Sequence, residues 1–112
     1  MRVLLAAILL CWSAAASAAE WIDALDIPLM PGLQLDADSE TRFETAGERI
    51  VEIEARGAVA PDAVRRYYAS ALPGLGWQAE SDAAMLRDGE RLRLEISGRD
   101  GAAIVVFRLT PQ

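Results

Sequence analysis

A chain of 112 residues has room for one domain, and its composition, 53% hydrophobic and 25% charged, is typical of a globular protein. The sequence contains no His or Lys and a single Cys, Cys11, which excludes catalytic triads, Schiff-base chemistry, Lys-dependent phosphate loops and structural zinc sites. The net charge of −6 argues against nucleic acid as a partner.

Residues 1–19 are expected to form a secretory signal peptide. Met1-Arg2 supplies a positive start, residues 3–10 are an unbroken apolar run, and residues 16–19 are small, as a cleavage site requires. Cleavage would remove Cys11 and leave 93 residues with a net charge of −7 and no membrane insertion. An uncleaved anchor is the alternative, but the apolar run is short for a bilayer span.

Residues 20–38 are predicted to form an acidic and apolar N-terminal arm, because their apolar positions follow neither the strand nor the helix period for long. Pro28 and Pro31 favour an extended chain after a short helical start at residues 21–25. The apolar side chains must either pack on the domain or be offered to another protein, and both alternatives stay open. In the second case the predicted partner-binding residues are Trp21, Ile27, Leu29, Met30 and Leu33.

Residues 39–112 are assigned to an α+β domain that begins with two strands. Residues 41–45 are the first, and residues 49–56, in which apolar and acidic side chains alternate, are the second. Residues 61–72 are predicted to form an amphipathic helix that starts at a proline and is stopped by Pro73-Gly74.

Three further strands are predicted after the helix. Residues 77–87 form one strand interrupted by a polar kink, Asp88-Gly89 forms a hairpin turn, and residues 90–97 and 102–110 complete the sheet. The last strand is apolar on both faces and is expected to be central. The pattern β-β-α-β-β-β predicts an α+β fold with a mainly antiparallel five-stranded sheet and one helix packed on one face. The order 2-1-5-4-3, numbered along the chain, keeps all neighbours antiparallel.

The run V-R-R-Y-Y-A-S-A-L-P-G-L-G-W at residues 64–77, preceded by D-I-P-L-M-P-G-L at residues 26–33, carries a resemblance. It resembles small exported proteobacterial proteins with a V..FY...LP.LGW helix-to-strand signature, with Tyr67 where Phe is more usual. The resemblance implies an α+β domain in the periplasm of a Gram-negative bacterium. It implies no activity, because that family has none assigned.

Three patterns suggest ligand chemistry but have simpler structural explanations. Gly74-Leu75-Gly76 follows a helix instead of opening one, so it is expected to end the helix and not to bind phosphate. Asp36, Asp38 and Glu40 resemble the start of a calcium loop whose later Gly and Glu are missing. A set of charged strand residues is expected to form cross-strand ion pairs, with a catalytic carboxylate pair as the alternative: Glu52, Glu54, Arg91, Arg93 and Glu95.

These observations predict a non-enzymatic exported module, monomeric alone, that binds a protein of the bacterial envelope through its arm, its open sheet face or an edge strand. The alternative is a carrier of a small apolar ligand held between helix and sheet near Tyr68 and Trp77. An enzyme using Asp or Glu comes third and would require a cleft with two carboxyl groups of separated pKa. No cofactor, metal or nucleic acid is expected.

Overall fold

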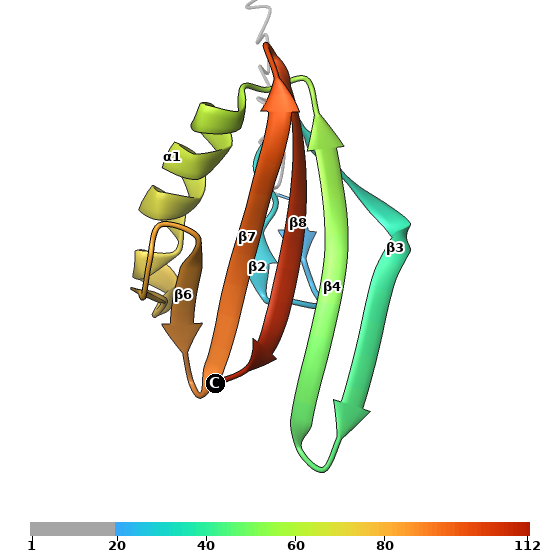
Figure 1. The fold of residues 1–112 in the computed structure, drawn as a ribbon, viewed down its shortest axis with the longest axis vertical. Coiled ribbons are helices and arrows are strands. Elements are labelled where there is room, and N and C mark those ends of the chain that lie inside the picture. Colours follow the sequence, from blue (N-terminus) through green and yellow to red (C-terminus); the bar gives the residue numbers. More distant parts are fainter. Residues whose placement is uncertain (1–19) are drawn as a thin grey trace, which may run out of the picture.

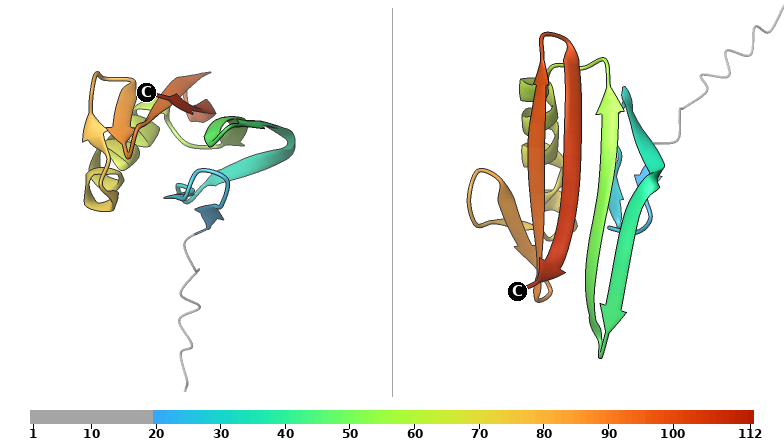
Figure 2. Two further views of the ribbon diagram at one scale, coloured as in Figure 1. Left: turned by 90° about the horizontal axis from the view of Figure 1, so that it is seen from below. Right: turned by 45° about the vertical axis from the view of Figure 1, so that its right-hand side comes forward.

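The computed structural model describes residues 20–112, so the predicted signal peptide lies outside the described residues. Six strands form one antiparallel sheet, and one helix, α1 (Pro61–Ala71), lies against one of its faces (Figure 1). In spatial order the strands are β3 (Leu33–Thr45), β4 (Glu48–Gly57), β8 (Ala102–Pro111), β7 (Glu90–Arg99), β6 (Ala84–Arg87) and β5 (Gln78–Ala79). A separate two-stranded hairpin of β1 (Trp21–Ile22) and β2 (Ile27–Pro28) lies on the same side of the sheet as α1 (Figure 2).

The predicted α+β class, the antiparallel sheet and the single helix are confirmed, but the count of five strands is wrong. Residues 77–87 do not form one interrupted strand. They contain β5 and β6, which pair with each other, Gln78 opposite Leu86. The polar residues between them, where the side chain of Ser81 accepts a hydrogen bond from the N–H of Ala83 at 3.4 Å, reverse the chain and do not merely kink it.

The predicted strand order is also wrong. The second predicted strand, β4, lies beside β8, with Val51 opposite Leu109 and Ala55 opposite Val105, and β3 takes the edge. Burial explains this order, because the apolar face of β4 is fully covered only when β4 has neighbours on both sides, whereas the polar sequence of β3 tolerates solvent. Since β3 begins at Leu33, the boundary expected between residues 38 and 39 falls inside a strand.

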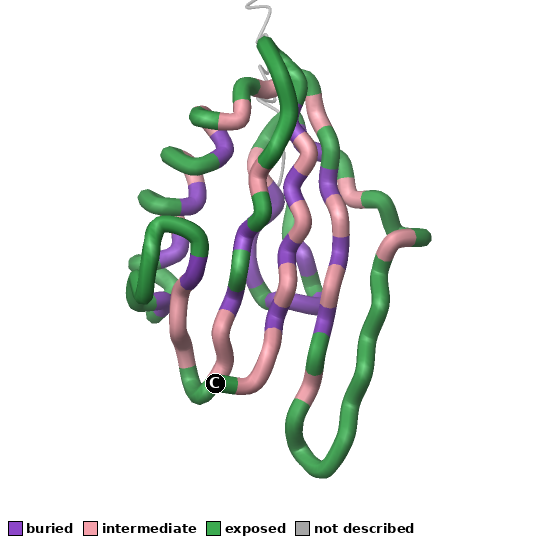
Figure 3. The backbone as a smooth tube through the Cα atoms, in the orientation of Figure 1, coloured by how far each residue is buried: buried purple, intermediate pink, exposed green. Residues whose placement is uncertain are grey.

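The core lies between the sheet and the layer formed by α1 and the arm. Alternate residues of the central strands face this layer, and Figure 3 shows the resulting change between buried and half-buried positions along β8. The helix contributes Val64, Tyr68 and Leu72, and the ring of Tyr68 meets the ring of Phe107 edge-on with centroids 5.4 Å apart. In the sheet, β8 lies between β4 and β7, so the expected central position of the last strand is confirmed.

Two tight turns fix the register of the hairpins. Asp88-Gly89, predicted from the sequence, has φ values of 49° and 78°, and Ala46-Gly47 has 46° and 83°. Positive φ at both central residues is the geometry of a type I′ turn, whose twist matches that of the flanking strands. The strands on either side of each turn therefore pair from the turn residues outward.

The helix begins and ends as the sequence predicts. Pro61 occupies its first turn, and a short 3-10 turn, η1 (Pro73–Leu75), follows its end. Gly76 closes this turn in the left-handed region with φ of 91°, a conformation that glycine adopts without strain. The predicted assignment of residues 74–76 to the helix end is confirmed.

Candidate interaction surfaces

The arm is part of the core. Ile27, Leu29 and Leu33 are at most 3% exposed, Met30 is half-buried, and of the five predicted partner-binding residues only Trp21 is exposed. The expected helical start at residues 21–25 is instead strand β1 followed by a turn. The arm thus packs on its own domain, because burying its large apolar side chains there removes more apolar surface from water than leaving them free.

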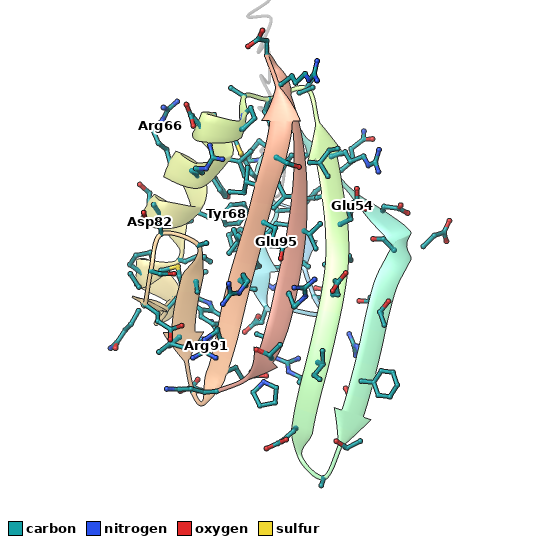
Figure 4. The ribbon with its side chains drawn as sticks, viewed as in Figure 1. Glu54, Arg66, Tyr68, Asp82, Arg91 and Glu95 are labelled. Atoms are coloured by element: carbon teal, nitrogen blue, oxygen red, sulfur yellow. The ribbon has the colours of Figure 1, made fainter. Side chains whose placement is uncertain are left out.

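The hydroxyl group of Tyr68 links the arm to the helix through two hydrogen bonds. It donates a hydrogen bond to the carbonyl oxygen of Pro28 at 3.0 Å and accepts one from the N–H of Met30 at 3.1 Å. Burial raises the pKa of this hydroxyl well above its usual value, opposed by the bond from Met30. Figure 4 shows Tyr68 directed from α1 toward the sheet. The hydroxyl of the side chain proposed for ligand binding therefore both donates and accepts a hydrogen bond within the protein.

Arg49 contacts the arm at a second position, the backbone of Ala24. Its guanidinium group donates to the backbone oxygen of Ala24 at 3.1 Å and forms a two-point ion pair with Glu90, with N–O distances of 2.9 and 3.2 Å. The hydrogen bond with Glu90 raises the pKa of Arg49. The pair spans β8, and both residues line an open cleft of about 600 Å³ between the two hairpin turns. Both charges are thus engaged in joining the arm to the sheet.

Tyr68 and Trp77 do not share a groove. Trp77 is 2% exposed, and the guanidinium carbon of Arg87 lies 4.2 Å from the centre of its ring, a cation–π contact. Its indole N–H has no hydrogen-bond acceptor among the described residues. Trp77 therefore packs under Arg87 at the exit of the helix and lines neither the cleft at the hairpin turns nor the groove beside α1.

A separate groove of about 270 Å³ lies between α1 and strands β6 and β7. Its apolar wall includes Tyr68, Leu72, Met85, Leu94 and Ile96, and its rim carries the polar side chains of Arg65, Ser81 and Asp82. Figure 4 places Asp82 in the loop beside α1. The groove lies where an apolar ligand was expected, with Tyr68 but without Trp77.

The sheet face turned away from α1 carries ion pairs. Arg108 on β8 binds Glu52 of β4 at 2.9 Å and Glu95 of β7 at 3.2 Å, so the cross-strand pairing expected for these two carboxylates is confirmed. Glu54 pairs with Arg56 at 2.7 Å, and Arg91 pairs with Glu80 at 2.6 Å. Among the described residues these carboxylates are held by arginines, which is the arrangement of a solvated sheet face.

The end of the β3–β4 hairpin carries exposed apolar side chains instead. Phe43 and Ile50 are 67% and 48% exposed, and they form a cross-strand pair on the face turned away from the core. Figure 3 shows the hairpin end as an almost continuous exposed segment. We call Arg42, Phe43, Glu44 and Ile50 the hairpin surface. Large side chains of this kind at a sheet edge are suited to protein contacts.

A bulge divides the edge strand β3 into two parts. The register with β4 shifts between Asp36 and Thr41, where the hydroxyl of Ser39 donates to the carbonyl oxygen of Asp36 at 2.6 Å and accepts the N–H of Glu54 at 2.9 Å. The acidic residues considered for calcium lie on this bulge. Regular pairing with β4 resumes at residues 41–45, so this part of the edge is a straight strand.

The hairpin surface was not predicted from the sequence. The predicted strand order puts residues 41–45 between two other strands, where they would have no free edge. A usable signal was present: the segment Thr-Arg-Phe-Glu-Thr has one apolar residue between two charges, a composition typical of an edge strand and not of an interior one.

No helix within residues 20–112 is long and apolar enough to cross a membrane, and no cluster of three potential metal-binding side chains occurs in the same residues. No family model matches the chain, and no curated protein and no solved structure was found to match it.

Proposed function

We propose that this protein is a non-enzymatic exported module that binds a polypeptide at the hairpin surface and the adjoining edge of β3. The single observation that carries the proposal is the position of Phe43 and Ile50, two exposed apolar side chains beside a strand edge that pairs with no other strand of residues 20–112. Unpaired backbone groups supply affinity for an extended segment, and neighbouring apolar side chains supply contact area.

The location of the partner follows from the export segment expected at residues 1–19. We propose that the protein works in the periplasm of a Gram-negative bacterium and that its partner is a protein of the envelope. Fractionation of cells that express the full chain tests this location: recovery in the periplasmic fraction, with an N-terminus at residue 19 or 20, supports it, and recovery of uncleaved protein in the cytoplasm contradicts it.

Photo-crosslinking in cells tests the binding surface. A photoreactive phenylalanine analogue at position 43 is expected to form adducts with a polypeptide, and the same analogue at position 75 is the matched control. Leu75 is also an exposed apolar residue, at 36%, but it lies in η1, which is neither β3 nor β4. Equal adduct yields at the two positions would contradict the proposal.

A second candidate function is the carriage of a small apolar ligand, favoured by the groove of about 270 Å³ beside α1. Its volume is just below the usual range of ligand pockets, which suits only a small molecule. A fluorescent apolar probe tests it. Ala69→Phe, in the groove wall, is expected to reduce probe binding, whereas Ser70→Phe, an exposed position on the helix outside the groove, is expected to leave it unchanged. Unchanged binding in Ala69→Phe would contradict this candidate.

A further inference from the structure

The backbone at the edge of β3 is oriented for pairing with another strand. Because Ala46-Gly47 is a two-residue turn, Thr45 and Glu48 form the first hydrogen-bonded pair of the hairpin. Hydrogen-bonded and non-hydrogen-bonded pairs then alternate along β3, so every second residue before Thr45 points its N–H and C=O toward β4. Phe43 is such a residue. Arg42 and Glu44 therefore direct their backbone groups outward, away from the sheet.

The segment at residues 41–45 is complementary to itself when it is reversed. In an antiparallel pair centred on Phe43, Arg42 of one strand lies opposite Glu44 of the other, twice, and Thr41 lies opposite Thr45, twice. Phe43 lies opposite its own copy. A register centred on Arg42 would instead oppose Arg42 to itself and Glu40 to Glu44. A register centred on Thr41 would oppose Arg42 to Glu40, but it would run into the bulge that ends at Thr41. Within the regular segment at residues 41–45, only the register centred on Phe43 joins unlike charges.

The same register satisfies the backbone geometry. Arg42 and the opposing Glu44 become hydrogen-bonded pairs, since both have outward N–H and C=O groups. The two Phe43 residues become a non-hydrogen-bonded pair, in which side chains approach most closely. Because Phe43 and Ile50 share a face, the pairing also creates one apolar row across four strands, Ile50, Phe43, Phe43 and Ile50.

We propose that the occupant of the β3 edge is a second copy of this chain, paired antiparallel through residues 41–45 so that two six-stranded sheets become continuous. The inference rests on the proposed function, since it names the partner of the same surface. A foreign strand would not require a segment that is complementary to itself, and the bulge at residues 36–41 limits the pairing to this segment.

The dimer is weak. Five residues from each copy, with Ile50 beside them, bury less than the roughly 1,000 Å² of a stable interface. The protein is therefore a monomer when dilute, as expected from the sequence, and a two-fold dimer at high concentration, as a self-complementary patch requires.

Sedimentation velocity of purified protein from about 10 μM to about 1 mM tests the dimer, a range that covers weak dissociation constants. Arg42→Glu and Glu44→Arg are each expected to raise the dissociation constant at least about tenfold, because each replaces two attractive pairs with two repulsive ones. The two changes alter the net charge in opposite directions, so a general effect of charge would strengthen one of them. Arg66→Glu and Glu48→Arg are the matched controls, exposed and outside the β3 edge, and are expected to leave the constant unchanged.

An equal mixture of Arg42→Glu and Glu44→Arg is expected to associate again, because the two acidic positions of one copy then face the two basic positions of the other. A parent protein that stays monomeric throughout, a tighter Glu44→Arg dimer or a mixture that does not associate would each overturn the inference. If the purified protein is monomeric while position 43 still crosslinks to another polypeptide in cells, the proposed function stands and the second copy does not. Denaturant unfolding of each variant checks that the monomer fold is retained.

Discussion

The N-terminal arm and the β3–β4 hairpin present the same kind of side chain in opposite environments. Of the eight large apolar residues at positions 20–38, five are buried beneath the sheet and two are half-buried, whereas the hairpin end leaves Phe43 and Ile50 exposed. The difference shows that apolar content alone does not identify a binding surface. What matters is whether a segment can reach a face of its own domain that is still uncovered.

Geometry decides which segment reaches that face. The arm lies beside α1 on the same face of the sheet, where Tyr68 and Arg49 form hydrogen bonds with its backbone. The hairpin end extends beyond the layer of α1 and the arm (Figure 2), so its side chains have no second layer to pack against. One apolar segment therefore builds the core, and the other remains for contacts with another chain.

Truncating one apolar side chain in each region should give the largest contrast. Ile27→Ala is expected to lower the free energy of unfolding by about 2–5 kcal/mol, because it leaves a cavity at a fully buried site. Phe43→Ala is expected to change it by less than about 0.5 kcal/mol, as is usual for exposed positions. Urea unfolding measures both, and a loss below about 1 kcal/mol for Ile27→Ala would show that the arm is not docked.

Removing the hydroxyl that fastens the arm should have the next largest effect. Tyr68→Phe is expected to cost about 1–3 kcal/mol, because the carbonyl of Pro28 and the N–H of Met30 lose a buried partner. Tyr67→Phe is the control, a half-buried neighbour for which no hydrogen bond is found among the described residues. Hydrogen exchange at the amide of Met30 should accelerate in Tyr68→Phe alone. Equal unfolding free energies for the two variants would argue against the fastening role.

The ion pair that joins arm and sheet should contribute less. Glu90→Gln is expected to cost about 1 kcal/mol, because the pair with Arg49 is only partly shielded from water. Glu44→Gln is the matched control, since its pair with Arg42 is exposed and 3.9 Å long. A double-mutant cycle of Glu90→Gln with Arg49→Met isolates the coupling, and a coupling of zero would mean that the pair does not stabilise the arm.

The smallest expected effect is the pH dependence of the Glu80–Arg91 pair on the open face. The hydrogen bond with Arg91 lowers the pKa of Glu80 below its usual value. The pair's stabilisation is therefore present above the ordinary glutamate pKa and is lost as the pH falls through the lower, folded value. NMR titration of the Glu80 carboxyl group in Arg91→Gln should show the midpoint moving upward, and an unchanged midpoint would contradict the pairing.

Local patterns in the sequence predicted most of the elements. The proline at residue 61 and the glycine at 76 bound the helix, the Asp88-Gly89 turn sets the β6–β7 hairpin, and alternation along β4, β7 and β8 marks the core face. These signals are readable because each depends on the conformation of a few adjacent residues.

The sequence by itself determined the class of fold, the helix, the core strands and the chemistries that its composition excludes. Only the tertiary structure decided that the arm is core, that β4 and not β3 lies beside β8, and that Phe43 and Ile50 remain exposed. Strand order and docking depend on which distant surfaces cover one another, so they follow from the total area buried across the whole chain and not from any local pattern.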